Sequence, residues 1–355
     1  MEAHSQKFRI EIGNVVMKKY RIYLDTKYWV YMRDASTEKA TITQTEIYRR
    51  LKNLVQKEVA ICPLSPHIFY ELMNIGDKEK RLKMAQVMDE LSQQICFISP
   101  FNIVGQELLS FVRLCQAKTE NKSIFNPAKY VFTKVPFVMG EMYPSIQELS
   151  NHQMNDIRIK FFDHLSKITL VEMLKTMKDD FPLWDRKNLI AKLNQGKDDN
   201  KDWNSFHEVF MHEIAGVLDV TKPEIEKLLV YLYQNDAGGS VSCEALTESK
   251  SVELSHRIYN AFAQNKINKE LPFFHISASL YAFIRYNKMQ RYDKNDLIDF
   301  SHVAWALPYC NAFFTEKPLH DWICNKPLKL NEIYGSRVLW NEENVLNALT
   351  QDNAN

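Results

Sequence analysis

Residues 21–25 of the chain read Arg-Ile-Tyr-Leu-Asp, a short apolar stretch that ends in a carboxylate. A run of this length and character is typical of a buried strand. Glu58-Val-Ala-Ile-Cys62 and Ile95-Cys-Phe-Ile98 predict two more strands. Helices are expected between these strands at about 41–57, 66–75 and 78–93, the second of them capped by Ser65 with Pro66 in its first position. Strands that alternate with helices predict βαβ units and a parallel sheet.

The same alternation returns near the end of the chain. Strands are expected at Ala312-Phe-Phe-Thr315 and Arg337-Val-Leu-Trp340, and helices at about 276–289, 296–307, 318–324 and after Asn341. Between about 104 and 270 helical stretches dominate, with a loop break near 196–200. We therefore expect an α/β fold with one sheet, built from residues 20–104 and 272–350 and interrupted by a mostly helical insertion at 105–271.

The charge balance restricts the classes of function. The chain has 45 Lys and Arg residues and 44 Asp and Glu residues, which gives a net charge of +1. A dedicated duplex-binding module is usually clearly basic. Any contact with a nucleic acid must therefore use a local patch.

The cysteines and the apolar stretches indicate the cellular compartment in which the protein is expected. The six cysteines, at 62, 96, 115, 243, 310 and 324, include no C-x-x-C pair. We interpret them as small buried hydrophobic residues in a reducing compartment, and not as a disulfide framework or a zinc site. The N-terminal residues form no apolar signal region, and no run of about 20 apolar residues occurs. We expect a cytoplasmic protein without a membrane partner.

Five acidic residues stand out by their positions. Asp25 ends the first predicted strand, and in open parallel sheets ligands bind beyond the carboxyl ends of the strands. Glu71 lies in the helix that follows the second strand. Asp296 and Asp299 are three residues apart, so a helix places both on one face, and Glu316 directly follows a strand.

Such a group of carboxylates predicts a cation site. Clustered carboxylates repel one another unless a cation neutralises them. Oxygen ligands select Mg²⁺ or Mn²⁺ over zinc. These ions lower the pKa of a bound water and stabilise charge on a phosphoryl group, which is the chemistry of phosphodiester hydrolysis.

Three stretches resemble one known family. Ile22-Tyr-Leu-Asp25-Thr-Lys-Tyr-Trp29 is similar to the opening strand of PIN-like nuclease domains, and Leu64-Ser-Pro-His-Ile-Phe-Tyr-Glu71-Leu72 is similar to their second acidic motif. Residues 295–317 are similar to the third and fourth motifs. The resemblance covers about 20–104 and 272–350 and leaves the insertion out.

The resemblance implies a fold and an activity. The fold is a three-layer α/β/α domain with a small parallel sheet, and its acidic site holds one or two divalent ions. The common activity of the family is cleavage of single-stranded RNA. Asp25 and Glu71 match the first two acids of the family.

The remaining acids match the family less closely. Asp299 matches the third acid through its spacing to Ala306, with Asp296 as the alternative at that position. Glu316 stands where the family usually has Asp, and its longer side chain would coordinate directly or through water. Asp321 would replace it only if its helix turns back towards the site.

Each candidate also has a structural interpretation. Asp25 and Asp296 are suited to cap helices, and Glu71 is suited to a solvated helix face, paired with a lysine. His302 lies on the same helix face as Asp299 and is more typical of packing, or of orienting a ligand, than of catalysis.

Two basic segments are candidates for RNA contact. The stretch Tyr281-Ala-Phe-Ile-Arg285-Tyr-Asn-Lys-Met-Gln-Arg291-Tyr292 combines aromatic and basic residues, which can stack on bases and hold phosphates. Its structural alternative is an amphipathic helix with a solvated basic face. Thr26 and Lys27, beside Asp25, are candidates for a phosphate contact.

The sequence thus predicts a metal-dependent endoribonuclease. By analogy with the family, we expect a toxin or antiphage effector that cleaves RNA, tRNA included, and that forms a homo-oligomer or binds a regulatory protein. One alternative is a catalytically inactive PIN-like scaffold that binds a protein or RNA partner. Another is a flap-type DNA nuclease, against which the neutral charge argues.

Overall fold

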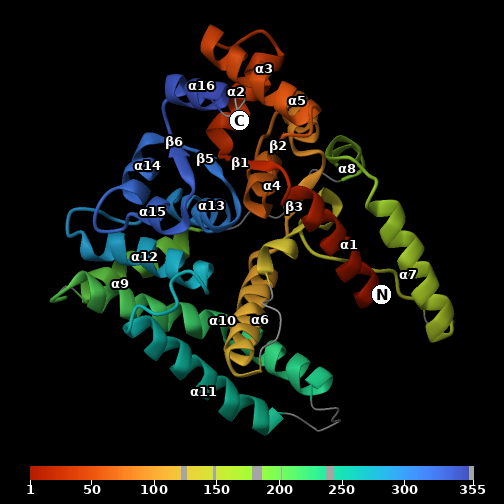
Figure 1. Cartoon of the computed structure of the whole chain (residues 1–355). Helices are drawn as coiled ribbons and strands as arrows, with labels where there is room; N and C mark the ends of the chain where they lie inside the picture. The colour runs from red at the N-terminus through yellow and green to blue at the C-terminus, as the bar shows by residue number, and fades with distance from the viewer. Residues whose placement is uncertain (121–125, 147–148, 178–185, 201, 237–243, 352–355) are drawn as a thin grey trace. The chain divides into compact units, whose positions relative to one another are not determined.

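The computed structural model describes residues 1–120, 126–146, 149–177, 186–200, 202–236 and 244–351. The protein is a mixed α/β protein, mostly helical and with a small parallel sheet (Figure 1). The chain divides into two compact units. The sheet unit comprises Met1–Ser99, Ala128–Leu183 and Trp305–Asn355, and the helical unit comprises Pro100–Pro127 and Trp184–Ala304.

The sheet unit contains a four-stranded parallel sheet in the order β2-β1-β5-β6 (Figure 1). The strands are β1 at Tyr20–Leu24, β2 at Ala60–Ile61, β5 at Ala312–Phe314 and β6 at Arg337–Leu339. In register, Tyr20 pairs with Ala60, and Phe313 pairs with Tyr23 on one side and Val338 on the other. The prediction of one parallel sheet that joins both ends of the sequence is confirmed.

The third predicted strand, however, does not join this sheet. β3, at Ile95–Phe97, pairs antiparallel with β4, at Phe132–Lys134. A single parallel bridge between Leu64 and Cys96 links β3 to the segment that follows β2. The sequence did not predict β4, because Phe132-Thr-Lys134 ends in two polar residues and so lacks the apolar run that indicated the other strands.

Helices surround these strands within the sheet unit. They are α1 Glu2–Val16, α2 Thr26–Ser36, α3 Ile42–Gln56, α4 Pro66–Met73, α5 Lys78–Ser92, α7 Asn151–Leu165, α8 Leu170–Thr176, α14 Lys317–Cys324, α15 Leu330–Tyr334 and α16 Glu342–Gln351, with a 3-10 turn, η2, at Val135–Phe137. The predicted start of α4 is confirmed, because the Ser65 hydroxyl accepts the Ile68 N–H at 3.2 Å and Pro66 occupies the first turn.

The boundaries of the two units differ from the predicted ones. Residues 128–183, which we assigned to the insertion, belong to the sheet unit. There the Asp89 carboxylate of α5 accepts the N–H groups of Leu170 and Val171 at 2.9 and 3.0 Å, which satisfies the first turn of α8. Conversely, residues 272–304 belong to the helical unit. An apolar helix face indicates burial, but it does not indicate which unit covers it.

The helical unit is built from α6 Pro100–Glu120, α9 Lys187–Asp199, α10 Phe206–Asp236, α11 Glu244–Ala263, α12 Pro272–Tyr286 and the first residues of α13 Asp296–Tyr309. A 3-10 turn, η1, at Pro127–Lys129 lies at its boundary. Its core contains Val209, Ile214, Phe262 and Phe274. The loop break expected near 196–200 is wrong, because α9 continues to Asp199. Gly196 destabilises a helix by only about 1 kcal/mol relative to alanine. The hydrogen bonds of the next residue, Lys197, can offset this loss.

The described cysteines are all free thiols. Cys62, Cys96 and Cys310 are buried, as expected, and burial raises the pKa of each thiol, that of Cys310 to about 12. Cys115 is exposed, which departs from the prediction, and Cys243 lies outside the described residues.

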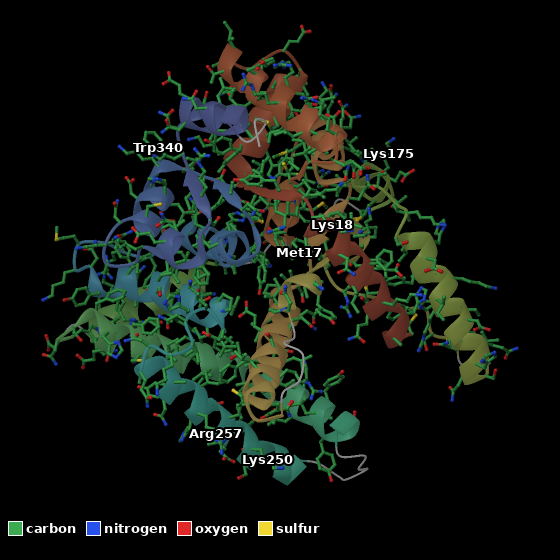
Figure 2. All side chains as sticks on the ribbon, viewed as in Figure 1. Met17, Lys18, Lys175, Lys250, Arg257 and Trp340 are labelled. Atoms are coloured by element: carbon green, nitrogen blue, oxygen red, sulfur yellow. The ribbon has the colours of Figure 1, made fainter. Side chains whose placement is uncertain are left out.

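Surface charge is mixed in both units. Side-chain nitrogen and oxygen atoms are spread over the helices of the molecule (Figure 2), and the net charge is +1. Within the described part of the chain, no helix combines the length and the apolar character that spanning a membrane requires.

Candidate functional site

The carboxyl edge of the sheet is formed by the residues that directly follow β1, β5 and β6, namely Asp25, Thr315 with Glu316, and Trp340. Because the strands are parallel, their carboxyl ends meet at one edge. The Asp25 N–H donates to the Phe314 carbonyl at 3.0 Å, and the Thr315 N–H donates to the Leu339 carbonyl at 2.9 Å. Main-chain hydrogen bonds thus extend beyond the strands and fix this edge.

Asp25 is the most buried acid of the edge, with 6% of its surface exposed. One of its oxygens accepts the Tyr28 N–H at 3.3 Å, so Asp25 is the N-cap of α2. The capping role considered for this residue is therefore real. A carboxylate has about four acceptor positions, so capping is compatible with cation binding.

Glu71 is joined to the same edge through its neighbour Thr26. α4 places Glu71 in a half-buried position, where its carboxylate accepts the Thr26 hydroxyl. The base of α4 is tied to β1, because the Tyr23 hydroxyl and the Ser65 hydroxyl are hydrogen-bonded at 2.7 Å. A short chain of polar contacts therefore connects the end of β1 with α4.

The charges of Asp25 and Glu71 act on nearby tyrosines. Burial is the main cause that raises the pKa of Tyr23, and the charges of Glu71 and Asp25 raise it further. Burial and the charge of Asp25 raise the pKa of Tyr28 in the same way. Both carboxylates thus act on the same buried ring.

The end of β5 contributes two residues with different surroundings. Thr315 is fully buried, and its hydroxyl has no hydrogen-bond partner among the residues that the structure describes. Glu316 is exposed and begins α14 without a capping bond from its side chain. Asp321 pairs with His320 at 3.0 Å.

The two aspartates of α13 lie in the helical unit. Asp296 is 5% exposed, and its carboxylate accepts the Asp293 N–H at 2.7 Å while the Asp293 carboxylate accepts the Asp296 N–H at 3.4 Å. This reciprocal pair resembles a capping box. Burial raises the pKa of Asp296 to about 6, and the charge of Asp293 adds to the rise. Asp299 is partly exposed, and His302 is 2% exposed, as a packing histidine would be.

The predicted RNA contacts differ in accessibility. Lys27 is partly exposed, with its ammonium 5.8 Å from the centre of the Tyr31 ring. Arg291 is exposed and pairs with Asp198 at 2.8 Å. Arg285 is 9% exposed and forms an ion pair with Glu213, so it does not belong to the solvated basic face considered for this helix.

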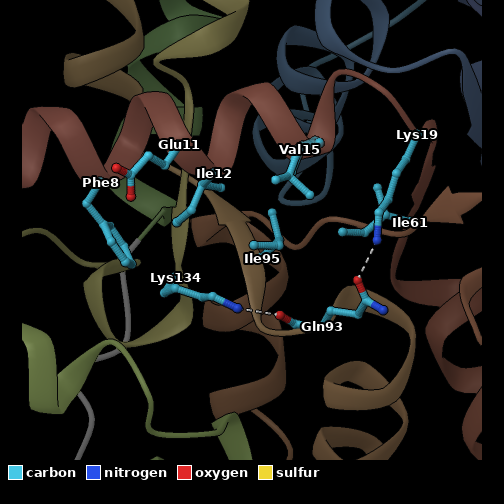
Figure 3. A pocket seen from close by; sticks show the side chains of 10 residues that line it. Phe8, Glu11, Ile12, Val15, Lys19, Ile61, Gln93, Ile95 and Lys134 are labelled. Atoms are coloured by element: carbon cyan, nitrogen blue, oxygen red, sulfur yellow. Dashed lines mark hydrogen bonds between the residues drawn. The ribbon is translucent and has the colours of Figure 1, made fainter. Parts of the chain in front are cut away.

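A separate cavity of about 290 Å³ lies in the sheet unit beneath α1 (Figure 3). Its walls are mainly apolar, from residues such as Ile12, Val15 and Ile95. The ammonium groups of Lys19 and Lys134 donate to the side-chain and backbone oxygens of Gln93 at 3.0 and 2.8 Å. The cavity is lined by none of the acids predicted from the sequence.

No group of three or more His, Cys, Asp or Glu side chains is arranged to hold a metal ion within the described ranges of the chain. At the carboxyl edge, Glu71 accepts the hydroxyl of Thr26, the residue after Asp25, and both carboxylates raise the pKa of Tyr23. Comparison of the chain with protein-family models, curated proteins and solved structures gives no match.

Proposed function

We propose that the chain is a PIN-like, divalent-metal-dependent endoribonuclease that hydrolyses phosphodiester bonds at the carboxyl edge of its sheet. The observation that supports this most directly is that the Glu71 carboxylate accepts the hydroxyl of Thr26, the residue that directly follows Asp25 at the end of β1. These residues stand where parallel α/β sheets bind their ligands. The small parallel sheet also agrees with a PIN-like domain, for which we propose the three-layer arrangement of that family.

The donors at this edge fit Mg²⁺ or Mn²⁺. Mg²⁺ usually keeps several waters and binds through one or two carboxylates together with substrate phosphates. Asp25 and Glu71 would hold the ion, and the buried Thr315 hydroxyl offers an oxygen in need of a partner at the same edge. When bound, such an ion lowers the pKa of a water and stabilises charge on the phosphoryl group.

Further residues would complete the site. Glu316, exposed after β5, would approach an ion directly or through water. Asp296 and Asp299 belong to the helical unit and are not used in the present proposal. The present proposal rests on the residues of the sheet unit. Lys27 and Thr26, in the first turn of α2, would contact the phosphate, where the helix dipole also favours negative charge.

The direct test is cleavage of mixed single-stranded RNA and tRNA with Mg²⁺ or Mn²⁺, with EDTA as the metal-free control. Asp25→Asn and Glu71→Gln retain shape and remove charge, and we expect each to lower the rate by at least about 100-fold, the upper end of the loss from a single outer-shell partner. Glu332→Gln is the matched control, because Glu332 is an exposed acid on α15 that pairs with Lys329. Cleavage that survives EDTA, or that both variants retain, would refute the proposal.

A catalytically inactive scaffold is the second candidate. The exposed position of Glu316 and the lack of a three-acid group among the described residues favour it. Calorimetric titration with Mn²⁺ separates the two, since a scaffold would neither bind the ion nor cleave RNA. A flap-type DNA substrate in the same assay tests the DNA nuclease alternative.

The analogy with the PIN-like family also suggests a role for the protein in the cell. We propose a cytoplasmic toxin or antiphage effector that acts as a homo-oligomer or with a regulatory protein partner. Expression in a bacterial host should then arrest growth, and expression of Asp25→Asn should not.

A further inference from the structure

The helical unit contains a pocket of about 760 Å³, which we call the helical-unit pocket. Its lining includes two aromatic residues, Trp203 and Tyr286, and the cationic residues Lys288 and Arg291. A volume of several hundred Å³ is typical of small-molecule and cofactor sites. All of its lining residues lie in the helical unit.

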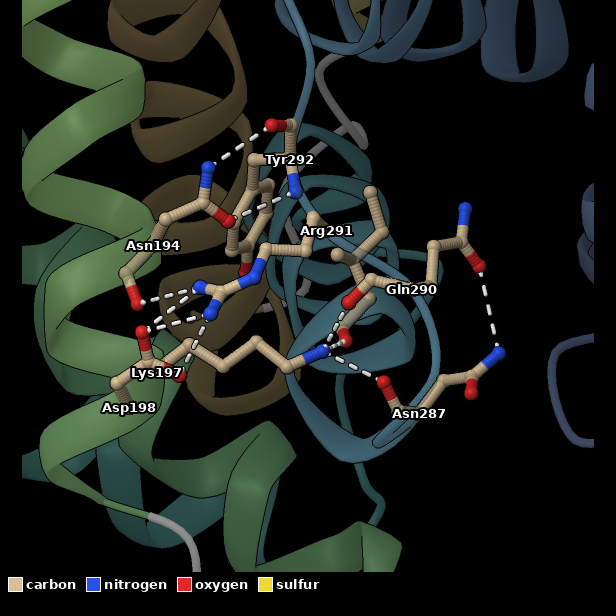
Figure 4. A network of polar contacts seen from close by, with 8 residues as sticks. Asn194, Lys197, Asp198, Asn287, Gln290, Arg291 and Tyr292 are labelled. Carbon is tan, nitrogen blue, oxygen red and sulfur yellow. Dashed lines mark hydrogen bonds and ion pairs between the residues drawn. The ribbon is translucent and has the colours of Figure 1, made fainter.

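One wall of the pocket is held rigidly by Lys197 (Figure 4). Its ammonium donates to the carbonyls of Ile284 at 2.6 Å, Asn287 at 2.5 Å and Gln290. All three donors of the ammonium are thereby used, on one carbonyl in the last turn of α12, one at its C-cap and one in the loop that follows. Burial is the main cause that lowers the pKa of Lys197. Lys197 therefore positions the wall and does not bind a ligand.

The loop after α12 is fixed to α9 as well. The Asn194 amide donates to the Tyr292 carbonyl at 2.9 Å, and its oxygen accepts the Tyr292 N–H at 3.0 Å (Figure 4). This pair of bonds holds the main chain directly after Arg291, and the bonds of Lys197 to Asn287 and Gln290 hold it before and after Lys288. The pocket is thus formed before a ligand arrives, which lowers the entropic cost of binding.

The cations of the lining differ in how they are engaged. Arg285 is buried and forms an ion pair with Glu213, so we assign it a structural role. Arg291 pairs with Asp198 through both its terminal nitrogens, at 2.8 Å, but this pair is exposed. Exposed ion pairs contribute little to stability, so a phosphate can replace the Asp198 carboxylate as the partner of the Arg291 guanidinium. Lys288 is exposed beside it.

The aromatic residues offer faces for a planar group. Tyr286 is 43% exposed and meets Phe206 edge-on at 6.0 Å between ring centres. Trp203 packs on the core of the helical unit, and its buried indole N–H has no hydrogen-bond partner among the described residues. Asp198 and Asp202 add acceptors to the lining, which suit the amino groups of a nucleobase.

We propose that the helical-unit pocket binds a nucleotide, with its phosphate on Lys288 and Arg291 and its base against Tyr286 and Trp203. Cations for phosphate, aromatic faces for stacking and acceptors for base edges are the groups that single nucleotides require. A free nucleotide and one nucleotide of an RNA strand share this chemistry. The inference does not depend on cleavage at the carboxyl edge.

The test measures binding to the full chain in EDTA, where metal-dependent cleavage is suppressed. AMP, UMP, adenosine and inorganic phosphate are titrated by calorimetry, and a fluorescent tetraribonucleotide by anisotropy. We expect AMP or the tetraribonucleotide to bind, more weakly as salt rises. Lys288→Ala, Arg291→Ala and Tyr286→Ala should each weaken binding by about tenfold or more. Lys192→Ala, an exposed lysine on α9 that does not line the pocket, should leave binding unchanged.

Each outcome decides a point. Binding of AMP alone supports a free nucleotide, and binding of the tetraribonucleotide alone supports a strand of RNA. The proposal is overturned if neither binds, if phosphate binds as tightly as AMP, or if the three variants bind like the wild type. Asp25→Asn should bind normally, so a failed cleavage assay and a failed pocket can be told apart.

Discussion

Charged side chains are held differently at the carboxyl edge of the sheet and around the helical-unit pocket. At the edge, Asp25 accepts a backbone N–H, and Glu71 accepts a hydroxyl from a neighbouring threonine. Around the pocket, Arg285 forms an ion pair with Glu213. A hydrogen bond from a neutral donor orients a carboxylate, whereas an ion pair brings two opposite charges together within the protein.

This difference separates groups that serve the fold from groups that suit a ligand. The charges of Asp25 and Glu71 still act on Tyr23, whose pKa they raise in addition to the effect of burial. In the proposed function, these two carboxylates would hold a cation. In the pocket, by contrast, the buried arginine is balanced by the fold, and only the exposed Arg291 and Lys288 face a ligand.

Substitution of the buried Arg285 should give the largest effect and tests the distinction between buried and exposed ion pairs. The side chains of Arg285 and Glu213 are 7% and 12% exposed. Arg285→Met should lower the free energy of unfolding by about 3 to 5 kcal/mol, because it leaves Glu213 with a buried and uncompensated charge. Arg291→Ala is the matched control and should cost at most about 1 kcal/mol, since its ion pair is exposed. Urea unfolding of both variants checks this, and equal losses would contradict the distinction.

A smaller effect concerns the buried Asp296. Burial raises its pKa in the folded protein to about 6, from an ordinary value of 3.8. Between about pH 4 and pH 6 the folded chain therefore binds more protons than the unfolded chain, so Asp296 makes stability fall as pH rises through this interval. The difference between the two pKa values corresponds to about 3 kcal/mol in the free energy of unfolding. Solvent screening beside the exposed residues 293–295 reduces this contribution to about 1 to 2 kcal/mol.

Asp296→Asn isolates this contribution. Asparagine can still accept the Asp293 N–H, so the variant should match the wild type at pH 4 and exceed its stability by about 1 to 2 kcal/mol at pH 8. Urea unfolding in EDTA across this range gives the difference. A wild type that is more stable than the variant at pH 8 would show that the charge of Asp296 is favourably compensated.

The sequence predicted those parts of the fold that leave a local signal. The apolar runs at 21–25 and 312–315 became the neighbouring strands β1 and β5, and Ser65 with Pro66 marked the start of α4. β4 shows no such signal, because only the first of its residues, Phe132, is apolar, whereas its partner β3 is apolar throughout.

The candidate site was predictable to a similar degree. The position of Asp25 after β1 follows from a local pattern and a general rule for parallel sheets. The contact of Thr26 with Glu71 joins residues 45 positions apart, and the ion pair of Arg285 with Glu213 joins residues 72 apart. Helical spacing alone placed Arg285 on a basic face, because it does not reveal which partner covers a given side of a helix.

The smallest effect tests whether the two roles of Asp25 are separable. Asparagine caps helices as well as aspartate does, so Asp25→Asn should stay within about 0.5 kcal/mol of the wild-type stability, whereas Asp25→Ala should lose about 1 kcal/mol with the cap of α2. Both should lack RNA cleavage. Thr41→Ala is the matched control, because Thr41 caps α3 in an exposed capping box, and its loss should cost a similar 1 kcal/mol or so while cleavage continues. If Asp25→Asn is stable and cleaves RNA normally, the carboxylate serves only as a helix cap, and the carboxyl edge is no longer a candidate for catalysis.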